Sequence, residues 1–365
     1  MQYKEPITMA NEQQPTAVSN EGDAATSLDV QLSGNLHLSS SPHIRHSESV
    51  RHIMAWVVIA LVPSLLAGTV FFGIKTLIIT AVSVVTALVT ERIVCLLQKR
   101  PSSISDLSAL VTGMLLAFNL PPDLPWWMAA IGSAFAIGVA KMAFGGLGAN
   151  FINPALAGRA FLMAAYPSAM TRFSPTLYGS LCGIDGLSSA TPLAHFKSAM
   201  ADGSFHPLDF QEALLDLFVG NVGGCLGETS VLALLIGGLI LVYKRIIPLR
   251  IPVVYIGTVF FLSWLFNGTG THFTSGAIIV PFYQIFAGGL FLGALFMATD
   301  MVTSPITPVG RIVFAAGCGI LTFIIRKFGG YPEGVSYSIL IMNLFVPLIE
   351  RYTRPGIYGK VKRRD

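Results

Sequence analysis

Residues 52–72 read HIMAWVVIALVPSLLAGTVFF, a stretch without Asp, Glu, Lys or Arg. A helix of about 20 apolar residues crosses the roughly 30 Å hydrocarbon core of a bilayer, so this stretch predicts a transmembrane helix. Further apolar stretches follow at 74–97, 107–120, 125–144, 154–167, 228–244, 248–267, 276–298, 309–327 and 334–350. The sequence therefore predicts an all-α polytopic membrane protein with about ten transmembrane helices.

The composition indicates the same class of protein. Of the 365 residues, 53% are hydrophobic and 12% are charged. A mean hydropathy of +0.67 excludes an ordinary water-soluble domain. The 36 glycines suit helices that approach one another closely in lipid. A net charge of only +4 gives no strongly basic surface, so we expect no nucleic-acid partner.

The chain divides into three regions. Residues 1–45 are polar and predict a flexible tail, because they cannot bury enough apolar surface to fold. Residues 46–350 form the predicted transmembrane bundle with a long loop at 168–227, and residues 351–365 form a basic tail. With the amino terminus in the cytoplasm, most of the 23 lysines and arginines fall on the cytoplasmic side, in agreement with the positive-inside rule. Both tails are then cytoplasmic, and the loop 168–227 is extracytoplasmic.

Two of the apolar stretches, 107–120 and 154–167, are visibly short. NLPPDLPWW follows the first at 119–127, and FGGLGANFINP leads into the second at 144–154. Short or broken helices are tolerated in a membrane where they face protein or a cavity, so we expect half-helices here. NPALAGR at 153–159 and SPITPVGR at 304–311 share a Pro before Gly-Arg, which suggests an internal duplication.

Three acids at the edges of apolar stretches are candidates for an ion pathway: Asp106, Glu228 and Asp300. Ionisable groups in a membrane are costly and usually serve a pathway or a partner. The alternative for Asp106 and Glu228 is a favourable charge at a helix N-terminus. Asp300 ends an apolar run instead, so it is the stronger candidate for contact with an ion or a cofactor.

Three further polar residues could hold a cofactor. Arg159 follows Gly near a predicted helix start, where it could bind a phosphate or a ring carbonyl; the alternative is snorkelling or pairing with an acid. Asn150 and Asn153 offer neutral amides to a cofactor edge. The alternative for Asn153, which precedes Pro154, is a helix N-cap.

The four cysteines, Cys95, Cys182, Cys225 and Cys318, form no CxxC pair. We therefore expect no iron-sulfur or zinc site built by this chain alone. Cys182 and Cys225 flank the same loop, so a disulfide between them stays open. The sequence contains no GxSxG or SxxK motif, and we expect no catalytic nucleophile and no metal site.

The predicted loop contains DGLSSATPLAHF at 185–196. Asp, Gly, Ser and Pro in this order are typical of a turn. The stretch Asp185 to Thr191 also resembles the motif at which a flavin transferase joins FMN, through its phosphate, to a threonine hydroxyl. Small neighbours and the rigid Pro192 would keep the Thr191 hydroxyl accessible to such an enzyme.

The resemblance extends over everything after the polar tail. It rests on SSPHI (40–44), LVTGMLLAFNLPPDLPWW (110–127), FGGLGANFINPALAGRAFL (144–162), DGLSSATPLA (185–194), GCLGETSVLALLIGG (224–238), GALFMATDMVTSP (293–305) and GGYPEGVSYSILIMN (329–343). The sequence resembles the D subunit of the Rnf complex, an ion-translocating ferredoxin:NAD oxidoreductase of the bacterial cytoplasmic (inner) membrane. It is also similar to the B subunit of the sodium-pumping NADH:quinone reductase.

The resemblance implies two flavins. FMN would be attached to Thr191, and the recognition stretch would be Asp185, Ser188, Ser189 and Ala190. A noncovalent riboflavin would lie nearer the cytoplasm, and its candidate contacts are Asn150, Asn153 and Asp300. The chain would be one subunit of a translocase, inactive alone, that moves electrons between ferredoxin and NAD partners coupled to Na+ or H+ translocation. Its expected partners are iron-sulfur and flavin subunits, the flavin transferase and the lipid bilayer.

Two other functions fit the helical pattern. A channel or transporter for a small polar solute would also use short, broken helices. A scaffold subunit that anchors peripheral partners is the third hypothesis. The threonine motif, rather than the fold, separates these functions.

Overall fold

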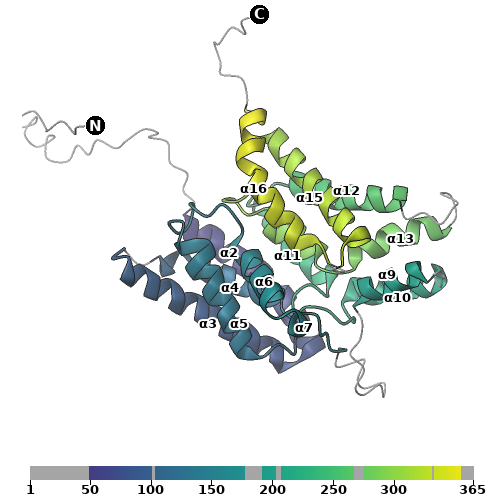
Figure 1. Ribbon diagram of the computed structural model, residues 1–365, viewed down its shortest axis with the longest axis horizontal. Helices are drawn as coiled ribbons and strands as arrows, with labels where there is room; N and C mark the ends of the chain where they lie inside the picture. The colour runs from purple at the N-terminus through teal and green to yellow at the C-terminus, as the bar shows by residue number, and fades with distance from the viewer. Residues whose placement is uncertain are drawn as a thin grey trace, which may run out of the picture. The chain divides into compact units, whose positions relative to one another are not determined.

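The computed structural model describes residues 49–100, 103–176, 191–202, 207–266, 275–330 and 333–354, and all of them belong to one compact unit. The predicted tail 1–45 and most of the tail 351–365 lie outside the described residues. So do Cys182 and the recognition stretch with Asp185, Ser188, Ser189 and Ala190. Every regular element in the described ranges is helical, which confirms the all-α prediction (Figure 1).

Each of the ten predicted apolar stretches contains at least one helix. In chain order the elements are α2 (Val50–Phe72), α3 (Ile74–Leu97), η1 (Ile104–Asp106), α4 (Ser108–Phe118), α5 (Trp126–Phe135), η2 (Ala136–Met142), α6 (Pro154–Ala165), α7 (Pro167–Met170), α9 (Pro192–Ala201), α10 (Pro207–Val219), α11 (Val231–Tyr243), α12 (Arg250–Phe266), α13 (Ser275–Phe286), α14 (Leu290–Leu292), η3 (Gly293–Met297), α15 (Pro308–Phe328) and α16 (Val335–Thr353). The elements η2 and η3 are π-helical continuations of α5 and α14.

The helices differ in their ability to cross a bilayer. In the described part of the chain, α2, α3 and α15 are long and apolar enough to span a membrane, and α13 with α14–η3 gives a fourth span if this pair, bent by 65°, is counted as one. The helices α4 and α6 have 11 and 12 residues, which corresponds to about 17–18 Å and is shorter than the hydrocarbon core. The prediction that the stretches 107–120 and 154–167 are short is therefore confirmed.

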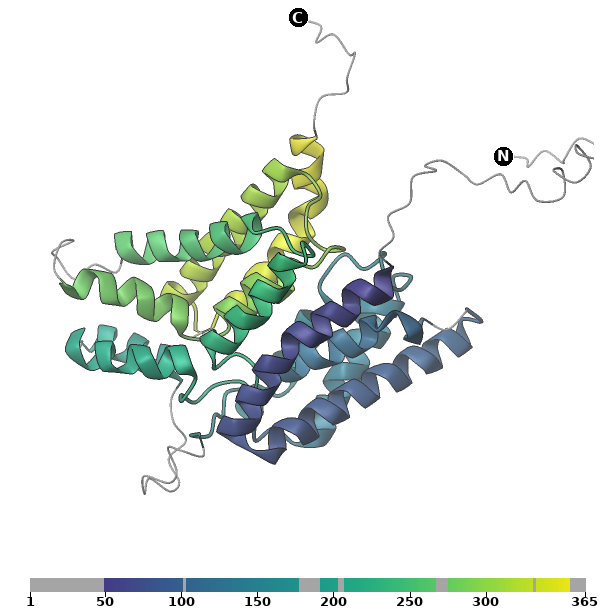
Figure 2. The same cartoon turned by 180° about the vertical axis from the view of Figure 1, so that it is seen from behind.

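The helices pack in two groups. In the first, α3 packs on α4 and α5, and α5 on α6; in the second, α12 packs on α13 and α15, and α15 on α16. The groups meet where α2 contacts α11 and where α6 contacts α16, and Figure 2 shows α2, in purple, beside α11, in green. Gly237 of α11 makes this contact close, because a Cβ atom there would lie 2.0 Å from the carbonyl oxygen of Ala60.

The two groups repeat one local pattern. In each, a π-helical segment is followed by a loop and by a helix with Pro in its first turn and a side-chain N-cap. The caps are Asn153, before Pro154, and Thr307, before Pro308. This pattern surrounds both copies of the Pro…Gly-Arg motif and supports the internal duplication suggested by the sequence.

Candidate functional site

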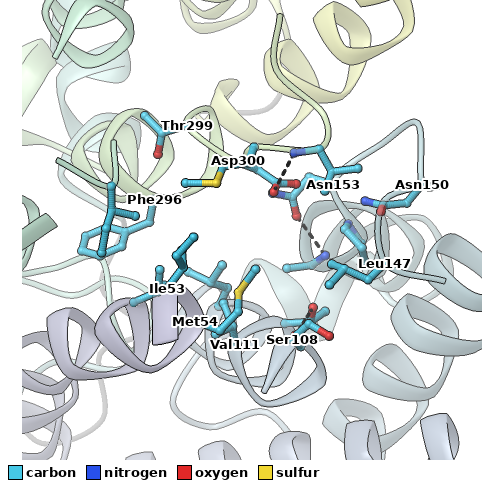
Figure 3. A pocket seen from close by; sticks show the side chains of 18 of the residues that line it. Ile53, Met54, Ser108, Val111, Leu147, Asn150, Asn153, Phe296, Thr299 and Asp300 are labelled. Atoms are coloured by element: carbon cyan, nitrogen blue, oxygen red, sulfur yellow. Dashed lines mark hydrogen bonds between the residues drawn. The ribbon is translucent and has the colours of Figure 1, made fainter. Parts of the chain in front are cut away.

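Two pockets contain most of the predicted site residues. The first, which we call the Asp300 pocket, has a volume of about 780 Å³. In Figure 3, Asn153 and Asp300 line it with the apolar side chains of Ile53 and Met54. The remaining lining comes from Val57, Ser108, Val111, Thr112, Leu115, Lys141, Leu147, Asn150, Pro154, Ala155, Leu241, Ile246, Ile247, Phe296, Thr299, Met301 and Val302. Both π-helical segments reach this pocket, through Lys141 and Phe296.

Asn153 connects the two helical groups at this pocket. Its Oδ1 atom accepts hydrogen bonds from the N–H groups of Ala155 (3.0 Å) and Leu156 (3.4 Å) at the start of α6. Its Nδ2 atom donates to the carbonyl oxygen of Met297, the last residue of η3, at 3.3 Å. The N-cap interpretation of Asn153 is therefore confirmed, while its contact with a cofactor stays a prediction.

Asn150 carries an unused acceptor. Its side chain is only 5% exposed and lines the Asp300 pocket. Its Nδ2 atom donates to the carbonyl oxygen of Ile152 at 3.3 Å, but Oδ1 is buried and has no hydrogen-bond partner among the described residues. A buried acceptor without a partner costs about 1–3 kcal/mol. One of the residues that line the pocket therefore carries a buried acceptor without a partner among the described residues.

Asp300 closes the turn after η3. Its Oδ1 atom accepts from the N–H of Val302 (3.4 Å), and its Oδ2 atom accepts from the hydroxyl of Thr303 (3.0 Å). Burial raises the pKa of Asp300 above its ordinary range, and the two hydrogen bonds oppose this rise only in part. A carboxyl group in such an environment can gain or lose a proton when charge changes nearby.

An ion pair at this pocket was not predicted from the sequence. Lys141 is 2% exposed and its Nζ atom lies 3.0 Å from Oε1 of Glu91, which is fully buried. Nζ also donates to the hydroxyl of Ser108 at 2.7 Å. A signal was present, because each residue is a charged group within a predicted membrane helix.

The second pocket, which we call the Thr191 pocket, has a volume of about 630 Å³. Thr191 is the N-cap of α9, and its Oγ1 atom accepts from the N–H of Ala194 at 3.3 Å. The other lining residues are Arg159, Met163, Met170, Thr171, Phe173, Pro192, Leu193, Leu217, Val222, Gly223, Gly224, Glu228, Thr229, Phe286, Gly288 and Glu333. Thr191, Arg159 and Glu228 are therefore brought together, apart from Asn150, Asn153 and Asp300.

A charged cluster forms one side of the Thr191 pocket. Arg159 is paired with Glu333, and its Nη1 atom lies 3.8 Å from Oε2 of Glu228. Burial disfavours the Glu333 carboxylate, but the Arg159 guanidinium outweighs this effect and holds the pKa of Glu333 below its ordinary range. The pairing of Arg159 with an acid, the alternative to a cofactor contact, is confirmed. Glu333 was not predicted, because it lies in the loop between α15 and α16.

The charged cluster leaves no room for a side chain at Gly289. A Cβ atom there would lie 2.4 Å from Oε2 of Glu228 and 2.6 Å from Oε1 of Glu333. The N–H of Gly289 donates to Glu333 at 2.9 Å. Glu228 and Glu333 also lie near Cys225, with potential metal-ligand atoms within 4.8 Å of one another. The guanidinium of Arg159 already supplies positive charge to these groups, which disfavours a metal ion beside it.

The remaining candidates lie elsewhere. Asp106 ends η1, two residues before α4, and is not among the lining residues of either pocket. Arg311 donates to the carbonyl oxygen of Pro305 at 3.1 Å. Cys225 is a buried free thiol, and its proposed partner Cys182 lies outside the described residues.

The two pockets lie at opposite ends of α11. Thr229 lines the Thr191 pocket just before this helix, and Leu241 lines the Asp300 pocket near its end. The helix has 13 residues, so Thr229 and Leu241 lie about 18 Å apart along its axis. On α6, in contrast, Ala155 of the Asp300 pocket and Arg159 of the Thr191 pocket are only about one helical turn apart.

The model of a known protein family, described as the NQR2, RnfD, RnfE family, matches residues 37–359. The chain belongs to this family. Three relatives are all named as the D subunit of such complexes, which confirms the resemblance to the Rnf D subunit drawn from the sequence.

The relatives cover nearly the whole chain. The D subunit of the Na(+)-translocating ferredoxin:NAD(+) oxidoreductase complex of Acetobacterium woodii is 48% identical over 312 residues, which are 85% of this chain and 91% of the relative. The D subunit of the proton-translocating ferredoxin:NAD(+) oxidoreductase complex of Clostridium ljungdahlii is 47% identical over 84% of this chain and 91% of the relative. The D subunit of the ion-translocating oxidoreductase complex of Stutzerimonas stutzeri is 42% identical over 85% of this chain and 92% of the relative.

Proposed function

We propose that this chain is the D subunit of an ion-translocating ferredoxin:NAD oxidoreductase complex and that it carries two flavins. FMN is joined covalently to Thr191, and riboflavin is bound noncovalently in the Asp300 pocket. The observation that supports assignment to this complex is a relative named as such a subunit, which is 48% identical to this chain over 91% of the relative's length. Iron-sulfur clusters belong to the partner subunits, since the four cysteines of this chain form no cluster motif.

The surroundings of Thr191 fit a phosphoester. Thr191 stands at the N-terminus of α9, a helix of 10 residues, where the helix dipole favours a negatively charged phosphate. The neighbouring pocket is lined by apolar side chains such as Met163, Phe173 and Leu217, which suit a flat ring system.

The Asp300 pocket fits an uncharged flavin. Its walls are mainly apolar, and its polar groups are few: the unused acceptor Oδ1 of Asn150, the amide of Asn153, the carboxyl of Asp300 and the ammonium of Lys141. A ring with N–H and C=O groups along one edge can satisfy the unused acceptor of Asn150, whereas a purely apolar ligand would leave it unpaired.

The flavins supply the redox chemistry when bound, and this chain supplies binding and electrostatics. Arg159 and Glu333 hold a fixed charge pair beside the Thr191 pocket, and Glu228 lies 3.8 Å from that arginine. A cation that moves to compensate the negative charge of transferred electrons needs acidic groups within the bundle. We therefore assign three acids to a path for sodium ions or protons: Asp300, Glu228 and Asp106.

The orientation follows from the basic residues. Both termini lie on the cytoplasmic side of a bacterial inner membrane. The segment before Thr191 lies on the outer side, where a flavin transferase outside the cytoplasm can reach it. The Asp300 pocket is then at the cytoplasmic end of α11.

Flavin fluorescence in a denaturing gel tests the covalent link. We expect a fluorescent band at the mass of this chain that survives SDS when the flavin transferase is present, and its loss in Thr191→Ala. Thr171→Ala is the matched control, because Thr171 lines the same pocket and, in the described part of the chain, its hydroxyl donates to the carbonyl of Pro167 alone. This variant should keep the band. A wild-type chain without fluorescence, made together with the transferase, would overturn the covalent flavin and favour the transporter hypothesis.

A further inference from the structure

Among the described residues that line the Asp300 pocket, Lys141 is the single Lys or Arg. It belongs to the π-helical segment η2, and π-helical turns within α-helices occur frequently at functional sites. Its side chain is 2% exposed, so its charge is removed from solvent. A buried cation at the wall of a ligand pocket acts strongly on any charge that appears on the ligand.

The ammonium group of Lys141 has two hydrogen-bond partners among the described residues. It has three N–H donors, of which one is directed to Oε1 of Glu91 (3.0 Å) and one to the hydroxyl of Ser108 (2.7 Å). The third has no partner among the described residues. The ion pair with Glu91 offsets part of the cost of burying the Lys141 ammonium group. The contacts thus fix a charged group at the pocket with one donor free.

We propose that Lys141 stabilises the negative charge that a flavin in the Asp300 pocket acquires on reduction, and that Glu91 and Ser108 position its ammonium group for this role. The proposal rests on the flavin proposed for this pocket. A neutral flavin ring that takes up two electrons and one proton carries one net negative charge, and a cation close to the ring favours that form. Glu91 and Asp300 have the opposite sign, so without Lys141 the pocket would repel the reduced ring.

The experiment isolates the charge of Lys141 from the stability of the ion pair. Lys141→Met alone would leave the buried Glu91 carboxylate without its cation, which is strongly destabilising. The comparison is therefore between E91Q and E91Q/K141M, both in the full-length chain with Thr191→Ala so that noncovalent flavin alone remains. Two quantities are measured on the purified protein: riboflavin released per chain on denaturation, and the midpoint potential of the bound flavin by spectroelectrochemical titration.

We expect E91Q to retain riboflavin. In E91Q/K141M the ratio of oxidised to reduced flavin at a given potential should be about tenfold higher than in E91Q, because one charge-assisted hydrogen bond to the reduced flavin is lost. For a two-electron couple this corresponds to a midpoint potential lower by about 30 mV. E91Q/K75M is the control, because Lys75 is an exposed cation paired with Asp123 outside the pocket; it should titrate like E91Q. Lys141→Arg with Glu91 intact keeps the charge and should titrate like the parent.

Equal potentials in E91Q and E91Q/K141M, both loaded with riboflavin, would overturn the role of Lys141 and leave the flavin site standing. A drop of about 30 mV in Lys141→Arg would overturn it as well, because that variant retains the charge. Absence of riboflavin from the parent chain would overturn the proposed flavin site, and this inference with it.

Discussion

Removal of the Arg159 guanidinium should strongly destabilise the bundle. Arg159 is 5% exposed, and its Nη1 atom donates to Oδ1 of Asn119 (2.7 Å) and to the hydroxyl of Ser336 (3.0 Å). It also pairs with Glu333. Methionine at this position preserves much of the volume but leaves a buried carboxylate without its cation. Loss of one partner from a buried ion pair costs roughly 3–5 kcal/mol, which is the decrease that we expect for Arg159→Met.

The free energy of unfolding can be measured by SDS titration in mixed micelles, followed by tryptophan fluorescence. Arg311→Met is the matched control, since Arg311 follows the Gly in the second copy of the motif and makes one hydrogen bond to the described residues, with the carbonyl of Pro305. Its loss should cost about 1 kcal/mol. R159M/E333Q should be more stable than R159M, because it removes the unpaired carboxylate. Equal losses in Arg159→Met and Arg311→Met, or no recovery in the double variant, would refute the reasoning.

Three further changes test the pockets and the helix contact. Asp300→Asn should impair ion-coupled electron transfer in vesicles but keep the fluorescent band, and unchanged coupling would remove Asp300 from the path. Because burial raises the pKa of Asp300, its ionisation lowers the stability of the folded protein, so wild type should become less stable relative to Asp300→Asn as the pH rises from about 4. A difference in stability that does not change with pH would contradict this. Asn150→Leu removes the unused acceptor and should weaken riboflavin retention about tenfold, measured as riboflavin per chain, whereas unchanged retention would exclude this contact. Gly237→Ala should cost about 1–3 kcal/mol through its clash with the Ala60 carbonyl, while Gly257→Ala, with nothing within 4 Å, should be neutral or stabilising; equal effects on unfolding would contradict the close approach of α2 and α11.

The positions of the helices were predictable because each apolar stretch is bounded by a local signal. Asn153 and Pro154, for example, predicted the start of α6, and the side chain of Asn153 caps that helix. The 65° bend between α13 and α14–η3 was not predicted, since Gly288, with φ of 74°, lies within one continuous apolar stretch. The π-helical turns at 136–142 and 293–297 were missed for a similar reason: their composition does not differ from that of an α-helix.

The pairing of charges was the least predictable part of the site. Glu91 and Lys141 lie 50 positions apart, and Arg159 and Glu333 lie 174 apart, so no local pattern connects them. The sequence did mark Glu91 and Lys141 as charges within apolar stretches. For Glu333 there was no such mark, because a carboxyl in a Gly-rich loop is normally solvated. Its burial follows from the contact of this loop with Gly289 and Arg159.

The short helices explain how the two pockets are joined. Because α4 ends at Phe118, Asn119 is its C-cap and is buried within the bundle, where Oδ1 accepts from Arg159 beside the Thr191 pocket. The Nδ2 atom of Asn119 faces Sδ of Met297 at 3.7 Å, and the Met297 carbonyl accepts from Asn153 at the Asp300 pocket. A full-length membrane helix in place of α4 would continue past this point and separate these groups. The early end of α4 therefore places a few buried polar contacts between the two pockets.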